Sequence, residues 1–203
     1  PENYGKKFYG PTTFRKGIEY SRNLMTVRIA KILGLDKILD LSKKLKIYEE
    51  IPELLSVSLG AAETTLINLT SAYAPFVNGG KKIRPNLISR IQDRRGKTIF
   101  QVQNRKCIGC DKFINESINY PKIENTNKRV LSEETAYLMT DLMQTVMDRG
   151  TGGSARWKYK FNRPAAGKTG TTQAWSDAWF VGFTPQIAAG CWFGVDDFRV
   201  PLG

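Results

Sequence analysis

The first quarter of the chain has apolar positions spaced for helices. Apolar side chains recur at helical spacing over residues 23–33 and again over residues 37–45. Ser21 lies just before the first of these segments and is its expected N-cap, while Gly34 follows it as the expected C-terminal stop. The pattern therefore predicts two consecutive helices that meet near a glycine.

The middle of the chain combines two longer helical patterns with a predicted hairpin and a polar region. Residues 62–77 carry apolar side chains at helical spacing, and residues 132–148 do the same behind Ser132, the expected N-cap. The apolar stripe of this second helix is expected to pack in the core. Residues 87–102 are interpreted as two short strands around an Asp-Arg-Arg-Gly turn. The polar residues 104–128 are expected to form an irregular surface excursion.

The last third of the chain is rich in predicted strands. Residues 167–172, 178–183 and 187–195 are separated by short turns. Sequential strands joined by short turns pair in antiparallel fashion, so we expect an antiparallel sheet on which the helices pack. Cys191, within the last apolar run, is expected to be a small buried hydrophobe.

Composition places the chain among globular proteins of one domain. Its 203 residues are 41% apolar and 25% charged, which is enough for one sizeable core. The sequence contains no internal repeat, and no apolar run approaches the roughly 20 residues needed to span a bilayer. We therefore expect one mixed α and β unit without a membrane-spanning segment of its own.

The chain is also strongly basic. Lysine and arginine total 31 against 19 acidic residues, which gives a net charge of +12. Such a charge is compatible with binding to nucleic acid or to an anionic surface. The positive residues are spread along the chain, so we expect a solvated surface and no nucleic acid partner. Attraction to anionic lipid and polymer is expected as a secondary effect.

The segment with the clearest chemistry is Gly167-Lys168-Thr169-Gly170-Thr171-Thr172, in a chain that has no histidine. One positive charge, several hydroxyls and an open backbone suit the binding of a carboxylate and the close approach of an acyl group. Without histidine, the chain holds neither a Ser-His-Asp triad nor a histidine metal ligand. If acyl chemistry occurs here, lysine has to help manage the protons.

A phosphate-binding loop is the competing interpretation of this segment, because Gly167-Lys168-Thr169 matches the end of the pattern G-x-x-x-x-G-K-[ST]. The first glycine of that pattern would fall at Asn162, and Pro164 lies inside the loop. The residues after Lys168 are also poor helix formers, whereas such a loop runs into a helix. The interpretation that fits is the K-T-G element of penicillin-binding proteins and β-lactamases, which lies on a strand lining an acyl-transfer site.

That interpretation requires an S-x-N triplet elsewhere, and Ser21-Arg22-Asn23 supplies one. The triplet alone is a weak signal, since Ser21 can be a helix cap and nothing more. Lys168 favours the functional interpretation, in which Ser21 and Lys168 face each other across one groove.

Beyond these two motifs, the chain resembles the transpeptidase domain of class A (bifunctional) penicillin-binding proteins of the 1A type. The resemblance follows the order of that family through nearly the whole chain, over residues 10–15, 21–28, 58–63, 72–80, 149–152, 167–172 and 177–185. It implies an α+β fold of the β-lactamase and transpeptidase type, an antiparallel sheet flanked by helices, incomplete at both ends. Residues 1–203 would then be part of one penicillin-binding domain, with residues 104–128 as a surface excursion.

The resemblance also implies catalytic roles for three residues. Ser21 would relay a proton towards the leaving nitrogen. Asn23 would hydrogen-bond the substrate amide and orient the lysine of the family's nucleophile motif. Lys168 would stabilise charge, bias the Ser21 hydroxyl and attract the terminal carboxylate of the substrate.

The rest of the K-T-G segment would bind substrate, again by resemblance. Thr169 and Thr171 would hold the carboxylate through their hydroxyls, and Gly170 would let the substrate backbone come close. The Thr171 backbone N–H would form half of an oxyanion hole. No metal ion and no cofactor are expected.

One motif of the family does not occur in the chain. The family's nucleophile is the serine of S-x-x-K, but no serine here has a lysine three positions later. In the family this motif precedes S-x-N, so it would fall before residue 1. We therefore expect a fragment of a transpeptidase domain, inactive alone, whose membrane anchor and glycosyltransferase domain belong to an N-terminal part of a parent protein.

The partners implied by the resemblance are peptidoglycan stem peptides ending in D-Ala-D-Ala and β-lactams, in a periplasmic or extracytoplasmic location. Contact with the membrane is expected only through the anchor of the parent protein. Two alternatives stay open: a serine β-lactamase or DD-carboxypeptidase of the same superfamily, and a non-catalytic peptidoglycan-binding domain. The sequence predicts no oligomeric state.

Cys107 and Cys110 form a C-x-x-C pair in the polar region. One such pair is half a zinc site, and neither a second pair nor a histidine completes it. An extracytoplasmic location permits a disulfide. A disulfide or free thiols are therefore favoured over a metal.

Overall fold

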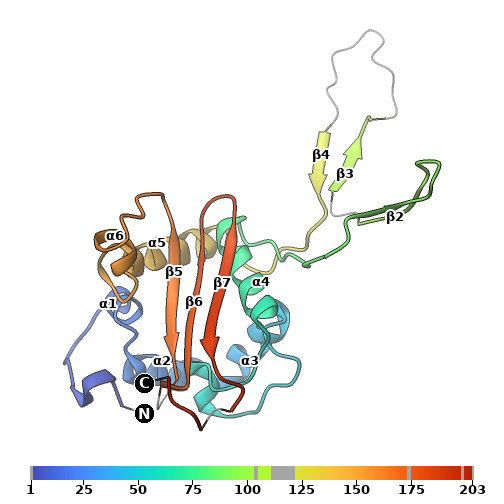
Figure 1. Cartoon of the computed structure of the whole chain (residues 1–203). Helices are drawn as coiled ribbons and strands as arrows, with labels where there is room; N and C mark the ends of the chain where they lie inside the picture. The colour runs from blue at the N-terminus through green and yellow to red at the C-terminus, as the bar shows by residue number, and fades with distance from the viewer. Residues whose placement is uncertain (1, 103–104, 111–121, 173–174, 198, 203) are drawn as a thin grey trace.

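The computed structural model describes residues 2–102, 105–110, 122–172, 175–197 and 199–202. Helices dominate the first part of the described chain, and strands dominate the end (Figure 1). The elements in chain order are η1 Tyr4–Lys6, α1 Phe14–Glu19, α2 Asn23–Leu33, α3 Leu35–Leu45, η2 Leu55–Leu59, α4 Leu66–Val77, β1 Arg90–Gln92, β2 Thr98–Gln101, β3 Arg105–Ile108, β4 Lys122–Asn125, α5 Glu133–Arg149, α6 Ser154–Trp157, β5 Ala166–Thr171, β6 Asp177–Phe183 and β7 Ala188–Gly194.

The central sheet consists of the last three strands in the order β5-β6-β7, and both pairs are antiparallel. The register places Ala166 opposite Phe183 at one end of β5 and Thr171 opposite Ala178 at the other. The predicted antiparallel sheet is therefore confirmed. Since β5 pairs with no described strand other than β6, one long side of β5 is an edge of the sheet in the described part of the chain.

Helices α4 and α5 pack on one face of this sheet. Met143 of α5, Ala166 of β5 and Phe183 of β6 form the buried cluster, and Tyr73 and Phe76 of α4 pack against it. The rings of these two aromatic residues meet edge to face, with centroids 5.7 Å apart. The apolar stripe of α5 is therefore core, as its helical periodicity predicts.

The predicted helices are present, with shifts at some of their ends: α3 begins at Leu35, two residues before the expected start, and α5 ends at Arg149, one residue after the expected end. Helix α4 begins at Leu66, four residues after the expected start, because the Thr65 side chain caps it there by accepting a hydrogen bond from the Asn68 N–H at 3.2 Å. Ser132 caps α5 as predicted, accepting from the Thr135 N–H at 3.1 Å.

The predicted capping role of Ser21 is wrong. Arg22 occupies the N-cap position of α2, and Ser21 has a left-handed backbone with φ of 51°. The side chain of Asn3 accepts a hydrogen bond from the Leu24 N–H at 3.2 Å instead. A residue of the N-terminal segment therefore satisfies the helix start, and the Ser21 hydroxyl is left for another contact.

Cys191 is also placed differently from the prediction, because its side chain is exposed. A Cβ atom at its neighbour Gly190 would collide with Thr70 of α4, so Gly190 faces the helices. Adjacent residues of a strand point to opposite faces, which puts Cys191 on the face away from α4. An apolar run reveals a strand here but not which of its faces is covered.

Two pairs of short strands extend from the helix and sheet body (Figure 1). Strands β1 and β2 form the predicted hairpin. Strands β3 and β4 pair from Arg105 opposite Asn125 to Ile108 opposite Lys122, so the prediction of an irregular region is wrong for these residues. Asn104 and residues 111–121 lie outside the described residues. Cys107 and Cys110 form a disulfide, one of the two states favoured from sequence.

Among the described residues, none of the helices combines the length and apolar character required to cross a bilayer.

Candidate active site

The structure brings Lys168 and Ser21 into direct contact, although 147 positions separate them in the chain. Lys168 lies in the middle of the edge strand β5, and Ser21 lies in the turn between α1 and α2. The ammonium of Lys168 donates a hydrogen bond to the Ser21 hydroxyl and another, of 3.0 Å, to the Thr169 carbonyl. The two sequence motifs therefore meet at one point, between the sheet edge and the helical layer.

The turn that carries Ser21 is held by its own backbone. The N–H of Ser21 donates to the Ile18 carbonyl at 3.2 Å, and the N–H of Arg22 donates to the Gly17 carbonyl at 2.8 Å. A left-handed backbone is uncommon for residues other than glycine and costs on the order of 1–2 kcal/mol. The turn keeps this conformation at Ser21, and it directs the hydroxyl towards β5.

A buried ion pair anchors α1, the helix before this turn. The Glu19 side chain is fully buried and accepts hydrogen bonds from Lys16 at 2.9 Å and from Arg149 at 3.2 Å. Burial alone would raise the pKa of Glu19, but the hydrogen bonds from the two cations outweigh it, so the net pKa lies below the usual value. Glu19 therefore stays ionised and joins α1 to the end of α5.

Burial strongly perturbs the charge of the Lys168 side chain. Burial lowers the pKa of Lys168 from 10.5 to about 8, because removal of water penalises the ammonium form. At neutral pH roughly nine tenths of the side chain would still carry a charge and roughly one tenth would be neutral. Such a group can attract an anion and can also exchange a proton near physiological pH.

The Thr169 hydroxyl lies on the side of β5 opposite to that of Lys168, as strand alternation requires. It is 2.7 Å from the Thr151 hydroxyl, in the loop between α5 and α6. The Thr151 N–H in turn donates to the Glu19 carbonyl at 3.1 Å. Sequence reasoning included Thr151 in the resembling run 149–152 without giving it a role, and it did not single out Glu19, since a contact between distant loops leaves no local periodic signal.

The backbone of Thr171 faces the open edge of the sheet. The N–H of the next residue, Thr172, donates to the Asp177 carbonyl across the β5–β6 ladder at 3.1 Å. N–H groups of an antiparallel strand alternate between its two sides, so the N–H groups of Thr169 and Thr171 point away from β6. Gly170, between them, has only the Cβ of Trp179 near its missing side chain. Backbone donors are therefore available where the strand has no neighbouring strand among the described residues.

Asn23 is the first residue of α2, and its amide group donates to the Glu2 carbonyl at 3.0 Å. The structure thus brings Ser21 to Lys168 and ties the Asn23 side chain to the N-terminal segment. None of the described residues forms a cluster of side chains suited to a metal ion.

The described chain has a three-stranded antiparallel sheet with helices on its face. A lysine of the edge strand is hydrogen-bonded to a serine of the helical layer. Together these features define the class of penicillin-recognising domains. The chain belongs to the family described as "Penicillin binding protein transpeptidase domain", whose model matches residues 2–195. Its similarity is to the 1A type. Penicillin-binding protein 1A of Rickettsia typhi is 42% identical over 199 residues, covering 97% of this chain and 25% of that protein.

More distant relatives are also penicillin-binding proteins of the 1A type. Penicillin-binding protein 1A of Aquifex aeolicus is 33% identical over 196 residues, covering 97% of this chain and 24% of that protein. The crystal structure of penicillin-binding protein 1A from Haemophilus influenzae superposes with a TM-score of 0.83 at 30% identity, covering 100% of this chain and 33% of that chain. The chain therefore spans about a quarter of the length of the curated relatives it matches.

Proposed function

We propose that this chain is part of a peptidoglycan DD-transpeptidase, which crosslinks stem peptides by serine acyl transfer and binds β-lactams. The observation that carries the proposal is the hydrogen bond from the Lys168 ammonium to the Ser21 hydroxyl. It unites the lysine of K-T-G with the serine of S-x-N in a family of transpeptidase domains.

In the proposed reaction, a serine of the parent protein attacks the carbonyl carbon of the penultimate D-Ala. The C–N bond to the terminal D-Ala breaks, and its nitrogen takes a proton as it leaves. An amine of a neighbouring stem peptide then attacks the acyl-enzyme ester, which forms a new amide bond and releases the serine. No redox change occurs, and every proton lost by an attacking group is returned to a leaving group.

Ser21 and Lys168 would deliver the proton to the leaving nitrogen. The Ser21 hydroxyl already accepts a hydrogen bond from Lys168, so its own hydrogen can point towards the substrate. The lowered pKa of Lys168, about 8, lets this pair exchange a proton near neutrality. Asn23 would bind the substrate amide once its side chain is released from the Glu2 carbonyl.

The edge of β5 would bind the substrate carboxylate and carbonyl. If Thr151 donates to Thr169, the Thr169 hydroxyl keeps its own hydrogen for a carboxylate oxygen. The Thr171 hydroxyl would add a second donor, and Gly170 would leave room for the substrate backbone. The outward N–H of Thr171 would supply one oxyanion-hole donor, whose loss typically raises the barrier by about 3 kcal/mol.

We place the serine nucleophile and the membrane anchor in the parent protein. No serine of this chain belongs to an S-x-x-K motif, so we expect the chain alone to form no acyl-enzyme. A transpeptidase acting on peptidoglycan works outside the cytoplasm, where a membrane anchor of the parent protein would hold it. A fold relative from Mycobacterium tuberculosis, 21% identical with a TM-score of 0.75, has been solved in complex with penicillin V.

Covalent labelling with a fluorescent penicillin tests the proposal. The chain alone and a longer protein that joins it to its S-x-x-K segment are incubated with the label and separated by denaturing electrophoresis. We expect a stable band on the longer protein only. A label on the chain alone would overturn the placement of the nucleophile. Rapid loss of the label would instead identify a β-lactamase or carboxypeptidase, and no label on either protein would identify a non-catalytic domain.

A further inference from the structure

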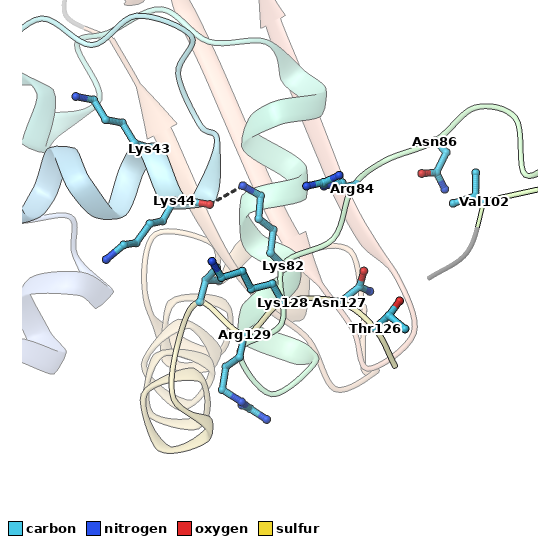
Figure 2. A pocket seen from close by; sticks show the side chains of 11 residues that line it. Lys43, Lys44, Lys82, Arg84, Asn86, Val102, Thr126, Asn127, Lys128 and Arg129 are labelled. Carbon is cyan, nitrogen blue, oxygen red and sulfur yellow. Dashed lines mark hydrogen bonds between the residues drawn. The ribbon is translucent and has the colours of Figure 1, made fainter. Parts of the chain in front are cut away.

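A cavity lies away from Lys168, and most of its polar lining is cationic. The cavity has a volume of about 670 Å³. It lies between the end of α3, the segment that follows α4, and the segment that leads into α5 (Figure 2). Its lining consists of Lys43, Lys44, Lys82, Arg84, Asn86, Val102, Thr126, Asn127, Lys128, Arg129 and Val130. These lining residues include no carboxylate.

Backbone pairing holds two of the cations side by side. The N–H of Lys82 donates to the Lys128 carbonyl at 2.9 Å, and the next residues pair as an antiparallel bridge between Lys81 and Arg129. The Gly80 carbonyl closes this short ladder by accepting from the N–H of Val130 at 2.8 Å. Like charges directly opposite each other on paired segments are destabilising. The fold therefore holds a charge repulsion at this point.

Carboxylates outside the cavity compensate only part of its charge. Lys44 pairs with Asp40 at 2.6 Å, and Arg129 pairs with Glu133 at 2.5 Å. Over the described part of the chain, no ion pair within 4.0 Å involves the four other cations, which are Lys43, Lys82, Arg84 and Lys128. The cavity therefore presents several positive charges that the described residues leave uncompensated.

Lys82 is the centre of this group. Its ammonium donates to the Lys44 carbonyl at 2.5 Å, which fixes the side chain across the cavity (Figure 2). Burial, followed by the charges of Lys46, Arg84 and Lys128, lowers the pKa of Lys82. An anion placed beside Lys82 would relieve both effects, because it would restore solvation of the ammonium and screen the neighbouring cations.

We propose that this cavity binds an anionic ligand that carries two or more phosphate groups. A phosphate group carries up to two negative charges near neutral pH and offers three acceptor oxygens, so it can satisfy several ammonium donors at once. One carboxylate would neutralise only one of the four cations. The volume lies within the range of small-molecule sites, and Asn86, Thr126 and Asn127 add neutral polar groups at the rim.

Two sources can present this chemistry. A soluble oligophosphate would enter the cavity whole, whereas clustered phosphates of an anionic lipid surface would reach it from the bilayer. Both use the same cations, so a single set of variants addresses the site, and the choice of probe separates the sources.

The test measures binding of tripolyphosphate to the 203-residue chain by isothermal titration calorimetry at low ionic strength. The double variant Lys82→Gln with Lys128→Gln removes two cavity charges. The control variant Lys31→Gln with Lys97→Gln removes two exposed charges outside the cavity. Circular dichroism and thermal unfolding verify that both variants are folded. Citrate serves as a probe with several carboxylates in place of phosphates. Sedimentation with phosphatidylglycerol vesicles, against phosphatidylcholine vesicles, tests the lipid source.

We expect the cavity variant to weaken tripolyphosphate binding at least tenfold and the control variant to change it less than twofold. Binding of phosphatidylglycerol vesicles that the cavity variant alone abolishes would support the proposal with a lipid source, and binding of tripolyphosphate alone would support it with a soluble source. Equal losses in the two variants would overturn the proposal, since they would reveal a general effect of net charge. Citrate binding as tight as that of tripolyphosphate, or no binding of either phosphate probe, would overturn it too.

Discussion

The hydroxyl groups of Thr151 and Thr169 lie 2.7 Å apart and join the loop after α5 to the edge strand β5. The same loop is tied to α1, because the Thr151 N–H donates to the Glu19 carbonyl at 3.1 Å. One threonine therefore links the segment that ends next to Ser21 with the strand that carries Lys168.

Replacing Thr151 by valine removes the hydroxyl and preserves the shape of the side chain. We expect Thr151→Val in the parent protein to slow acylation by a fluorescent penicillin roughly three- to tenfold, since one neutral hydrogen bond contributes about 0.5–1.5 kcal/mol. The second-order rate constant of labelling measures this effect. Thr98→Val, in the exposed strand β2, is the matched control. An unchanged rate for Thr151→Val would show that Thr169 needs no positioning by this loop.

The buried Glu19 predicts a dependence of stability on pH. Its folded pKa is lowered, so its contribution is complete above the unfolded pKa of about 4.5 and is lost as the pH falls through the folded value. We expect Glu19→Gln to lower the Tm of the chain by roughly 3–6 °C at pH 7 and the difference to shrink as the pH falls below the unfolded pKa of about 4.5. Differential scanning calorimetry from pH 3 to 8 measures the Tm of the wild type and of the variant.

The control for this experiment is Glu133→Gln. Its partner, Arg129, is exposed like Glu133 itself, so this pair should change the Tm by less than about 2 °C. Equal shifts for the two variants would mean that burial of Glu19 adds nothing to its ion pairs.

The left-handed backbone of Ser21 predicts that two variants which both lose the hydroxyl differ in stability. Ser21→Gly relieves the steric cost of a φ of 51°, while Ser21→Ala keeps that cost and also lacks the hydroxyl. We expect the glycine variant to be more stable than the alanine variant by about 1 kcal/mol in urea unfolding of the chain. Penicillin labelling of the parent protein should be impaired in both. If the alanine variant is the more stable, the turn does not strain Ser21.

The lowered pKa of Lys168 predicts how acylation changes with pH. In the proposed function the ammonium attracts the carboxylate of a β-lactam, and it loses its charge as the pH rises through about 8. We therefore expect the labelling rate of the parent protein to fall between pH 7 and 9, earlier than an ordinary lysine would allow. Lys168→Arg keeps its charge over this range and should show no such fall, whatever its absolute rate. If the labelling rate falls in the same way in the wild type and in Lys168→Arg, a group other than Lys168 titrates in this range.

Local patterns predict the elements of this fold well and its contacts poorly. The helical spacing of residues 23–33 gives α2 its observed bounds, and Ser132 identifies the start of α5, because these signals lie within one turn of chain. Ser21 has the residue type of a cap, but its backbone and its contact with Lys168 are decided by segments far away in the sequence. The exposure of Cys191 likewise depends on which face of β7 the helix α4 covers.

In the candidate site, too, local patterns reveal some residues and miss others. The K-T-G and S-x-N motifs reveal Lys168 and Ser21 because each motif is contained in a few consecutive residues. Thr151 lies in a run that resembles the family but receives no role from it, and Glu19 has no signal, since glutamate is common on helices and loops. Their relevance follows only from the hydrogen bonds that connect α1, the loop after α5 and β5.

A double-mutant cycle on labelling of the parent protein tests most directly whether residues 21 and 168 act as one catalytic unit. The second-order rate constants for Ser21→Ala, Lys168→Gln and the combined variant are compared with that of the wild type. The effects of groups that work as a unit are strongly non-additive, so we expect the combined variant to be hardly slower than the slower of the two single variants. Losses that multiply in the combined variant would contradict this expectation.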